Sequence, residues 1–205
     1  MINKPKIKDT YISDLGTAIK NDVYSKLNVT GTEKNIILKD ITLDCNIFNN
    51  VDFSSYVISC IDLIDCKFCN CDLPNINFSN RFIRRIEFDN CKLIGTLFDN
   101  TNFSDVTFNN CILRYISFNK AIIKNVHFIS CNMEEGNFMN TNIKDVIFDV
   151  CNLKKCDFYE TSLANIDLSS SNIEGIRINI NDLKDSTINL TEAIIIANML
   201  GINVK

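Results

Sequence analysis

The residues with the most reactive side chains in this 205-residue chain are its ten cysteines. Thiols can pair as disulfides, bind a metal ion or pack as small apolar side chains. The spacing of the cysteines must decide among these roles, because it fixes which side chains share a face. Five of them recur every 20 residues: Cys71, Cys91, Cys111, Cys131 and Cys151.

The element that positions the cysteines is a five-residue repeat. Stepping by five from Leu38 to Ile188 gives 31 positions, and every one is Phe, Leu, Ile or Met. Chance would produce this in a chain that is 46% hydrophobic with odds of roughly 10⁻¹⁰. The residue two positions earlier is usually small or apolar too, and residues two apart in extended chain share a side. We therefore expect two inward positions in each pentapeptide and three polar positions that face water and turn a corner.

The 20-residue period predicts that four pentapeptides make one turn. Central residues of one type then stack in columns, as in Phe48, Phe68, Phe88, Phe108, Phe128 and Phe148. A square coil of this kind must send its backbone hydrogen bonds to the coils above and below, and it gains stability only by stacking. The fold class expected is an all-β solenoid of about eight coils, on the order of 37 Å long.

The repeat resembles the pentapeptide-repeat family, whose consensus is A-(D/N)-L-x-x. Matching segments are Cys71–Asn75, Thr101–Asp105, Thr141–Asp145 and Cys151–Lys155. The resemblance covers about residues 36–188 and implies a right-handed quadrilateral β-helix; the handedness comes from the resemblance alone. Three segments are expected: an N-terminal capping segment (1–35), the pentapeptide-repeat β-helix (36–188), and a C-terminal helix and tail (189–205).

The cysteine column is expected to hold reduced, buried thiols. Stacked Cα atoms about 4.8 Å apart fall within the disulfide range, but parallel side chains on neighbouring coils and an odd number of cysteines disfavour pairing. Metal binding is the other alternative, by this column or by Cys60, Cys66, Cys69 and Cys71. In that group Cys69 should point outward while Cys66 and Cys71 point inward on different sides, which spoils tetrahedral convergence.

The two ends break the repeat and are expected to cap it. Near the N-terminus, Ile12, Leu15, Ile19 and Val23 have helix-like spacing, and Asn28–Gly31 has the composition of a turn.

At the C-terminal end, Asn189 and Glu192 form a capping box, an apolar run follows, and Gly201 ends the predicted helix. One apolar face is enough to cover the last coil, so the helix has a second face to bury. This segment also resembles the end of Qnr-type pentapeptide-repeat proteins, which implies a two-fold homodimer, rod end to rod end. The residues expected at the dimer interface are Ile194, Ile195, Met199, Leu200, Ile202 and Val204.

The sequence favours a non-catalytic protein without a cofactor. Its only histidine, His127, stands at an outward position and is expected to be an ordinary surface residue. Catalytic left-handed β-helix acyltransferases use a six-residue period and need a histidine base, and no GxSxG, phosphate-binding loop or HExxH motif is present. The polar, Lys-rich start and the lack of a long apolar run predict a cytoplasmic protein that neither enters a membrane nor carries a signal segment.

Two functions remain open. The first is a rod-shaped dimeric scaffold for protein interactions, with an unknown partner. The second, implied by the resemblance to Qnr-type proteins, is a DNA mimic that binds a type II topoisomerase such as gyrase and does not itself bind nucleic acid. Duplex DNA of this length would carry roughly 22 negative charges, whereas the chain carries only −4. The best acidic face holds Glu87, Asp89, Asp149 and Asp167.

Elsewhere, opposite charges stand 20 residues apart and predict pairing between coils rather than a field aimed at a partner. Asp65, Arg85 and Asp105 alternate in one column. Arg81 is the exception, because it occupies an inward position where an uncompensated charge is costly. We expect a local bulge that turns Arg81 outward; the alternative is a basic partner-binding corner of Arg81, Arg84 and Arg85.

Overall fold

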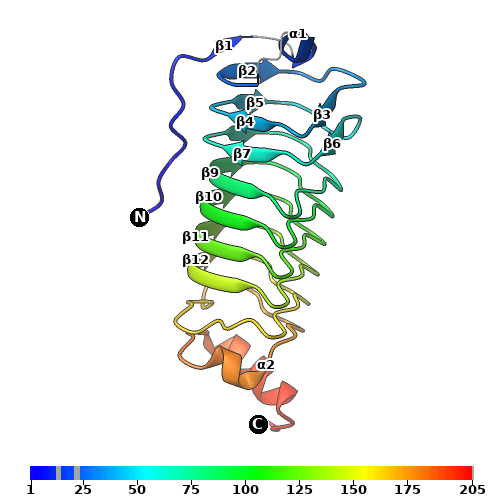
Figure 1. Cartoon of the computed structure of the whole chain (residues 1–205). Coiled ribbons are helices and arrows are strands. Elements are labelled where there is room, and N and C mark those ends of the chain that lie inside the picture. The colour runs from blue at the N-terminus through cyan, green and yellow to red at the C-terminus, as the bar shows by residue number, and fades with distance from the viewer. Residues whose placement is uncertain (13–14, 21–23, 205) are drawn as a thin grey trace.

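The computed structural model describes residues 1–12, 15–20 and 24–204. The chain forms a stack of coils whose first coil lies near the top of Figure 1 and whose C-terminal helix lies at the bottom. Its elements are β1 (Tyr11–Ile12), α1 (Leu15–Lys20), β2 (Leu27–Thr30), β3 (Ile37–Lys39), β4 (Thr42–Asp44), β5 (Ile47–Asn49), β6 (Val57–Ser59), β7 (Asp62–Ile64), β8 (Lys67–Cys69), β9 (Phe82–Asp89), β10 (Asn102–Asn109), β11 (Ile122–Ile129), β12 (Asn142–Asp149), the 3-10 helix η1 (Ile180–Leu183) and α2 (Leu190–Met199).

From β3 onward, each strand pairs in parallel with the strand one coil away, at an offset of 20 residues. Phe88 of β9 lies between Phe68 of β8 and Phe108 of β10. The same register joins β10 to β11 and β11 to β12. The solenoid predicted from the spacing is therefore confirmed.

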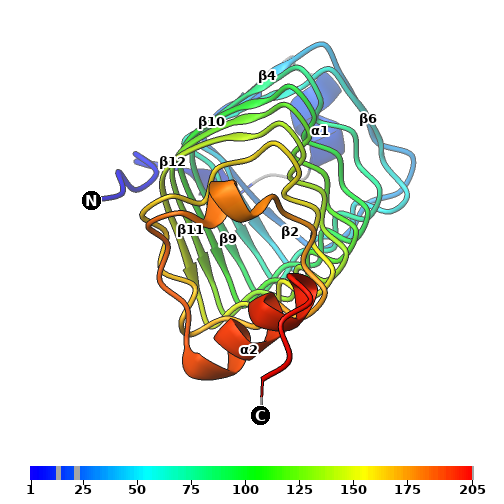
Figure 2. The ribbon, with the colours of Figure 1, turned by 90° about the horizontal axis from the view of Figure 1, so that it is seen from below.

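Seen along its axis, the solenoid has a four-sided outline (Figure 2). We call the side centred on the column from Phe48 to Phe148 wall A, and the adjoining side centred on the column from Leu43 to Ile143 wall B. Each of the strands β9 to β12 runs along wall B, turns at one residue and continues along wall A. The turning residue of β9 is Arg85.

The regularly paired part is slightly shorter than predicted. Six strands follow one another on wall A, one from each coil, in the order β5-β8-β9-β10-β11-β12. The regular ladder is therefore about six turns long rather than eight. Beyond β12 the five-residue register persists, but the backbones meet only at single bridges such as Asn152 with Asn172 and Asp167 with Thr187.

The corners explain why so many outward positions are Asn or Asp. From Asp40 to Asn165, every fifth residue except Ser55 has φ between 51° and 69°. This left-handed conformation costs an ordinary L-residue about 1–2 kcal/mol, and Asn and Asp tolerate it best after glycine. The polar residue at this position therefore makes the turn as well as facing water.

The interior is filled by stacked phenylalanine rings. On wall A the rings of Phe88 and Phe108 have centroids 4.9 Å apart. A second stack, on the opposite side, places Phe98 and Phe118 5.4 Å apart. The two stacks meet edge to face across the core, as between Phe118 and Phe128 at 5.8 Å. Both are favourable aromatic geometries, and together they fill the solenoid.

The bulge predicted at Arg81 is wrong. Strand β9 begins one residue later and keeps its register, with Phe82 opposite Asn102. The flanking residues Asn80 and Arg85 hold the usual corner conformation. Arg81 is half-buried, and its Nε is buried without a hydrogen-bond partner. A long aliphatic stem can occupy an inward position while the charged head reaches the surface, so the backbone need not deform.

The described part of the predicted N-terminal helix is α1, Leu15–Lys20. Ile12 belongs to strand β1 instead, and Val23 lies outside the described residues. Leu15 is fully buried, and its backbone N–H donates to the carboxylate of Glu33.

The turn predicted at Asn28–Gly31 is also wrong, because Leu27–Thr30 form strand β2. Leu27 and Val29 are buried, and the strand pairs with β5 of the first coil. Alternating apolar residues at the end of a ladder favour one more strand over a turn, since the last edge needs a partner.

Residues 1–10 form an extended arm that runs back outside the solenoid, along the corner between walls A and B (Figure 1). The backbone N–H of Lys6 donates to Asp65 at 2.7 Å. The backbone and side-chain nitrogens of Asn3 donate to Asp105 at 3.2 and 3.0 Å. These corner carboxylates therefore hold the arm in place.

The sequence carried a signal for this arm that the repeat analysis missed. Lys4, Lys6 and Lys8 are exposed, whereas Pro5 and Ile7 between them are half-buried. An alternation with period two is typical of an extended segment with one side against a surface.

Helix α2 covers the last coil. The side chain of Asn189 accepts a hydrogen bond from the backbone N–H of Glu192 at 3.0 Å, so half of the predicted capping box is confirmed. The reciprocal half is not formed among the described residues, because Glu192 Oε2 is buried without a hydrogen-bond partner. Ile196, a residue of this helix, is buried against the last coil. Gly201 follows the helix and has a φ of 75°. Among the described residues, no helix is both long and apolar enough to cross a membrane.

Candidate interaction surfaces

Charged side chains on the coils pair with residues one coil away. Lys67 Nζ lies 3.2 Å from Glu87 Oε2. The same offset joins Arg85 to Asp65, Lys92 to Asp72, Arg114 to Glu134, Lys154 to Glu174, Lys155 to Glu135 and Arg177 to Asp157. The predicted charge pairing is confirmed. Exposed pairs each contribute only about 0–1 kcal/mol, and their charges largely cancel toward a partner.

The pair between Arg85 and Asp65 is the most buried, with side chains 13% and 7% exposed. Arg85 Nε donates to Asp65 Oδ1 at 2.6 Å, and a terminal guanidinium nitrogen contacts Oδ2. These hydrogen bonds lower the pKa of Asp65 although burial opposes the shift. The pair also anchors the arm, because Asp65 is the acceptor for Lys6.

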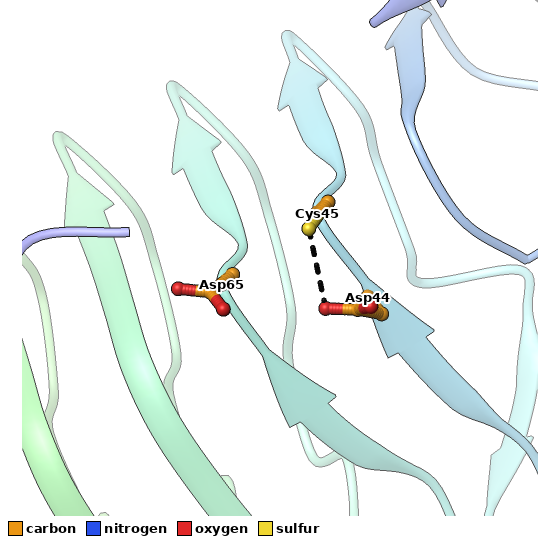
Figure 3. A group of neighbouring side chains, drawn as sticks. All are labelled: Asp44, Cys45 and Asp65. Carbon is orange, nitrogen blue, oxygen red and sulfur yellow. Dashed lines mark hydrogen bonds between the residues drawn. The ribbon is translucent and has the colours of Figure 1, made fainter. Parts of the chain in front are cut away.

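Asp44, Cys45 and Asp65 bring three possible metal ligands together at this corner (Figure 3). Their ligand atoms lie within 4.8 Å of one another. Cys45 Sγ donates to Asp44 Oδ1 at 3.3 Å, and partial burial and this bond raise the pKa of the thiol. Arg85 already holds both oxygens of Asp65. A cation would have to break that pair, so the group fits a hydrogen-bonded corner better than a metal centre.

The structure places the five-cysteine column in the interior, with each residue at most 3% exposed. Each thiol donates to a phenylalanine carbonyl of the preceding coil, as Cys91 does to Phe68 at 3.4 Å and Cys111 to Phe88 at 3.5 Å. All ten cysteines lie within the described residues and are free thiols there. The column acts as packing with weak hydrogen bonds.

The denser group of cysteines faces in different directions, as the spacing predicted. Cys66 and Cys71 are buried, Cys69 is half-buried on the outside of wall A, and Cys60 is exposed at a corner. Burial raises the pKa of Cys66 to about 12.

Wall A carries the four acids predicted to face a topoisomerase: Glu87, Asp89, Asp149 and Asp167. They do not form one patch. Glu87 is ion-paired with Lys67, and Asp89 accepts a hydrogen bond from Asn109 at 2.7 Å. Asp149 lies three coils further along than Asp89, with Asn109 and Ile129 between them in the column.

His127 stands outward on wall A, as predicted, but is half-buried beside the arm. A hollow of about 390 Å³ there is lined by arm residues, including Lys4, and by Glu87, Thr107 and His127. Burial, and then the charge of the Met1 amino group, lower the pKa of His127. The arm therefore covers part of the predicted acidic surface with a basic segment.

The predicted interface residues of α2 and the tail lie at the C-terminal end. Five are exposed and one, Ile195, is half-buried: Ile194 (39%), Met199 (48%), Leu200 (52%), Ile202 (55%) and Val204 (50%). Leu190, which the sequence reasoning passed over, is the most exposed at 81%. Beside them a hollow of about 390 Å³ opens against Ile180, Leu183, Ile188 and Ile196.

Wall B carries cations outside the column pairing. Arg84, Lys124 and Lys144 occupy one outward column, with Ser104 between the first two. All three cations are exposed, and among the described residues none lies within ion-pair distance of a carboxylate. The sequence prediction included only the corner of Arg81, Arg84 and Arg85. Lys124 and Lys144 could have been found because they stand at multiples of 20 residues from Arg84.

Comparison with protein families gives one match, to the model described as the pentapeptide repeat region. It matches residues 61–127, 101–178 and 121–193, which together span more than half of the chain. The chain belongs to the pentapeptide-repeat family. Its solenoid is accordingly the right-handed quadrilateral β-helix of that family.

Solved structures of the family resemble the chain at low identity. Full-length QnrB1, a plasmid-mediated fluoroquinolone resistance protein, is 16% identical over 84% of this chain and 100% of its own, with a TM-score of 0.39. HetL, a pentapeptide repeat protein involved in heterocyst differentiation regulation in the cyanobacterium Nostoc, is 11% identical over 80% and 85%, with a TM-score of 0.34. A pentapeptide repeat protein from the Arabidopsis thaliana thylakoid lumen is 24% identical over 48% and 66%, with a TM-score of 0.38.

No curated protein sequence matches the chain. Proteins of the pentapeptide-repeat family are generally structural or interaction proteins rather than enzymes.

Proposed function

We propose that the protein is a non-catalytic interaction rod that forms a homodimer through its C-terminal end. The observation that carries the proposal is the apolar surface left open by α2 and the tail, where Leu190, Met199 and Leu200 are 81%, 48% and 52% exposed. Contiguous apolar residues at one end of a polar rod mark a protein contact.

A second copy of the chain fits this end. The apolar hollow between η1 and α2, lined by Leu183 and Ile196, lies beside the exposed Met199 and Leu200. A two-fold axis through the end would let each protomer offer protruding apolar side chains to the other's hollow. The two rods would then extend in opposite directions from one contact.

Sedimentation tests the dimer. A variant with Met199→Asp and Leu200→Asp is expected to sediment as a monomer at micromolar concentration, while the wild type sediments as a dimer. The β-type circular dichroism spectrum should stay unchanged, because both residues lie outside the coils. Ile147→Asp is the matched control, since Ile147 is 45% exposed on wall A. A wild type that is monomeric under these conditions would mean that α2 serves only as a cap.

Binding to a type II topoisomerase is the second candidate function, supported by the acids of wall A. We expect little inhibition of gyrase supercoiling at low-micromolar protein, because Glu87 is neutralised by Lys67 and Asp149 is remote from it. Any binding should be confined to this wall and fall steeply with salt. A supercoiling assay with purified gyrase, with and without a fluoroquinolone, tests this candidate function. Strong inhibition by sub-micromolar dimer that survives charge reversal of Glu87, Asp89, Asp149 and Asp167 would contradict this expectation.

A further inference from the structure

Wall B contains a notch that is as wide as one strand and follows β10. Asn102 and Ser104 of β10 are half-buried, whereas the residues beside them on β9 and β11 are exposed. The register places Asn102 between Phe82 and Ile122. Two short polar side chains thus form the floor between longer neighbours. The resulting hollow is about 400 Å³.

The walls of the notch differ along its length. At one end Phe82 and Ile122 are 63% and 49% exposed, so two large apolar side chains face solvent on either side of Asn102. At the other end Arg84 and Lys124 flank Ser104. None of the residues that line the hollow is acidic: Ile64, Phe82, Ile83, Arg84, Asn102, Phe103, Ser104, Ile122 and Lys124.

Three carboxylates lie near the notch: Asp62, Asp105 and Asp145. Asp105 and Asp145 line an adjoining hollow together with Arg84 and Lys124, but no ion pair joins them to these cations in the described part of the chain. Asp62, on the rung before Phe82, accepts a hydrogen bond from the Phe82 backbone N–H at 2.8 Å. Asp105 at the corner accepts from Asn3 and Asn125. The two cations of the notch therefore lack an ion-pair partner among the described residues, unlike the column pairs on the other walls.

We propose that this notch binds an extended peptide segment of a partner protein that carries an apolar and an acidic side chain two residues apart. Asn102 and Ser104 are themselves two apart on one strand, a separation of about 6.6–6.8 Å, which matches side chains on one face of an extended peptide. The acidic group would lie over Ser104 between Arg84 and Lys124, and the apolar group between Phe82 and Ile122. The backbone N–H and C=O groups of β10 are already hydrogen-bonded to β9 and β11. The peptide would therefore be recognised by side chains of the notch.

This inference rests on the proposed interaction role and names the partner's chemistry. The probe is a capped, fluorescein-labelled peptide of Thr and Ser that contains Phe-Thr-Asp, and a second that contains Asp-Thr-Phe. Fluorescence anisotropy at low salt with the full-length protein should show saturable binding of at least one of them. Replacing Asp by Asn, or Phe by Ala, in the peptide should weaken binding about tenfold or more, which is about 1.4 kcal/mol.

Variants of the protein locate the binding. Arg84→Glu with Lys124→Glu should weaken binding of the Asp peptide at least about tenfold and favour the same peptide with Lys in place of Asp. Lys34→Glu with Lys184→Glu makes the same change in charge at two exposed positions outside the notch, and should have no effect. The Lys peptide keeps the test valid, because its recovery requires a folded variant.

The proposal is overturned by absent saturable binding, by binding that the Arg84 and Lys124 changes leave unaltered, or by tighter binding of a labelled oligothymidine than of either peptide. Sedimentation is measured on the same samples. A dimer that does not bind the peptides would contradict the notch and leave the proposed dimer intact, whereas a monomer that binds them would contradict the dimer and leave the notch intact.

Discussion

The ring of Phe108 lies parallel to the ring of Phe128, with centroids 5.0 Å apart and planes inclined by 6°. Phe88 stacks on the other side of Phe108 at 4.9 Å. No part of the Phe108 side chain reaches solvent. The stability of the rod is therefore expected to reside in such columns.

Phe108→Ala should lower the free energy of unfolding by about 3–5 kcal/mol, the usual cost of truncating a buried phenylalanine. Asn109→Ala is the control. It removes one hydrogen bond to Asp89 from the outside of wall A, and should cost about 0.5–1.5 kcal/mol. Urea unfolding measures both. Equal losses would mean that the inward and outward positions are assigned the wrong way round.

The cysteine column should resist alkylation. Iodoacetamide applied to the native protein should modify the exposed Cys60 first and leave the five column residues intact. Burial also raises the pKa of Cys66 and Cys156 to about 12, so these two thiols should stay unreactive. Mass spectrometry identifies the modified cysteines. All ten cysteines should react after denaturation without reductant. Fast native labelling of the column would refute the packing role.

Asp65→Asn should destabilise the protein by about 1.5–3 kcal/mol at neutral pH, because it removes a charged acceptor from Arg85. The folded-state pKa of Asp65 is lowered, so the stabilisation is fully present above the unfolded-state pKa of about 3.9 and is lost as pH falls through the folded value. Urea unfolding at pH 7 and below pH 4 should show the difference from wild type shrink. Asp145→Asn, in the same corner column and exposed, should differ little at either pH.

Val150→Asn should stabilise the protein. Val150 holds a corner with φ of 53° and is 59% exposed, although β-branched residues are strongly disfavoured there. Asn90 and Asn110 occupy the same corner three and two coils earlier, respectively. The gain should be about 1 kcal/mol, seen as a higher melting temperature. Ile147→Asn changes an exposed residue in extended chain, and a similar gain there would argue against the corner explanation.

Removing residues 2–8 should raise the pKa of His127 toward its ordinary value. Arm residues line the hollow beside this side chain and are expected to contribute to its burial, and the Met1 amino group adds a repelling charge. The chain has one histidine, so its imidazole protons can be followed by NMR titration without assignment. An unchanged pKa would show that the arm leaves wall A in solution.

Periodicity made the coils predictable, because each Phe, Leu or Ile in the repeat has the same neighbours one coil away. Residues outside the repeat lack that redundancy. Two alternating apolar residues, Leu27 and Val29, are too short a pattern to distinguish a strand from a turn. The segment forms strand β2 because it pairs with β5 and covers the first coil. Arg81 misled for another reason: a position that faces inward by register need not bury the end of a long side chain.

The surfaces were harder to predict than the coils. Column spacing showed that Lys154 would meet Glu174. It could not show that residues 1–10 fold back over Asp65 and Asp105, since no repeat relates the arm to the corner. The notch on wall B likewise arises from the sizes of neighbouring side chains on three strands, which a search for charge pairs overlooks.

The pairing of charges one coil apart constrains how such a chain can change in length. Losing or gaining a single pentapeptide keeps the apolar phase but rotates every later residue by one wall relative to every earlier one. A change between Lys154 and Glu174 would therefore separate that pair, and a change between Ser104 and Lys124 would move Lys124 out of the notch. A change of 20 residues keeps every residue on its own wall. The interior therefore tolerates steps of five, whereas the exterior accepts only whole turns, and the surface rather than the core sets the unit in which this solenoid can grow or shrink.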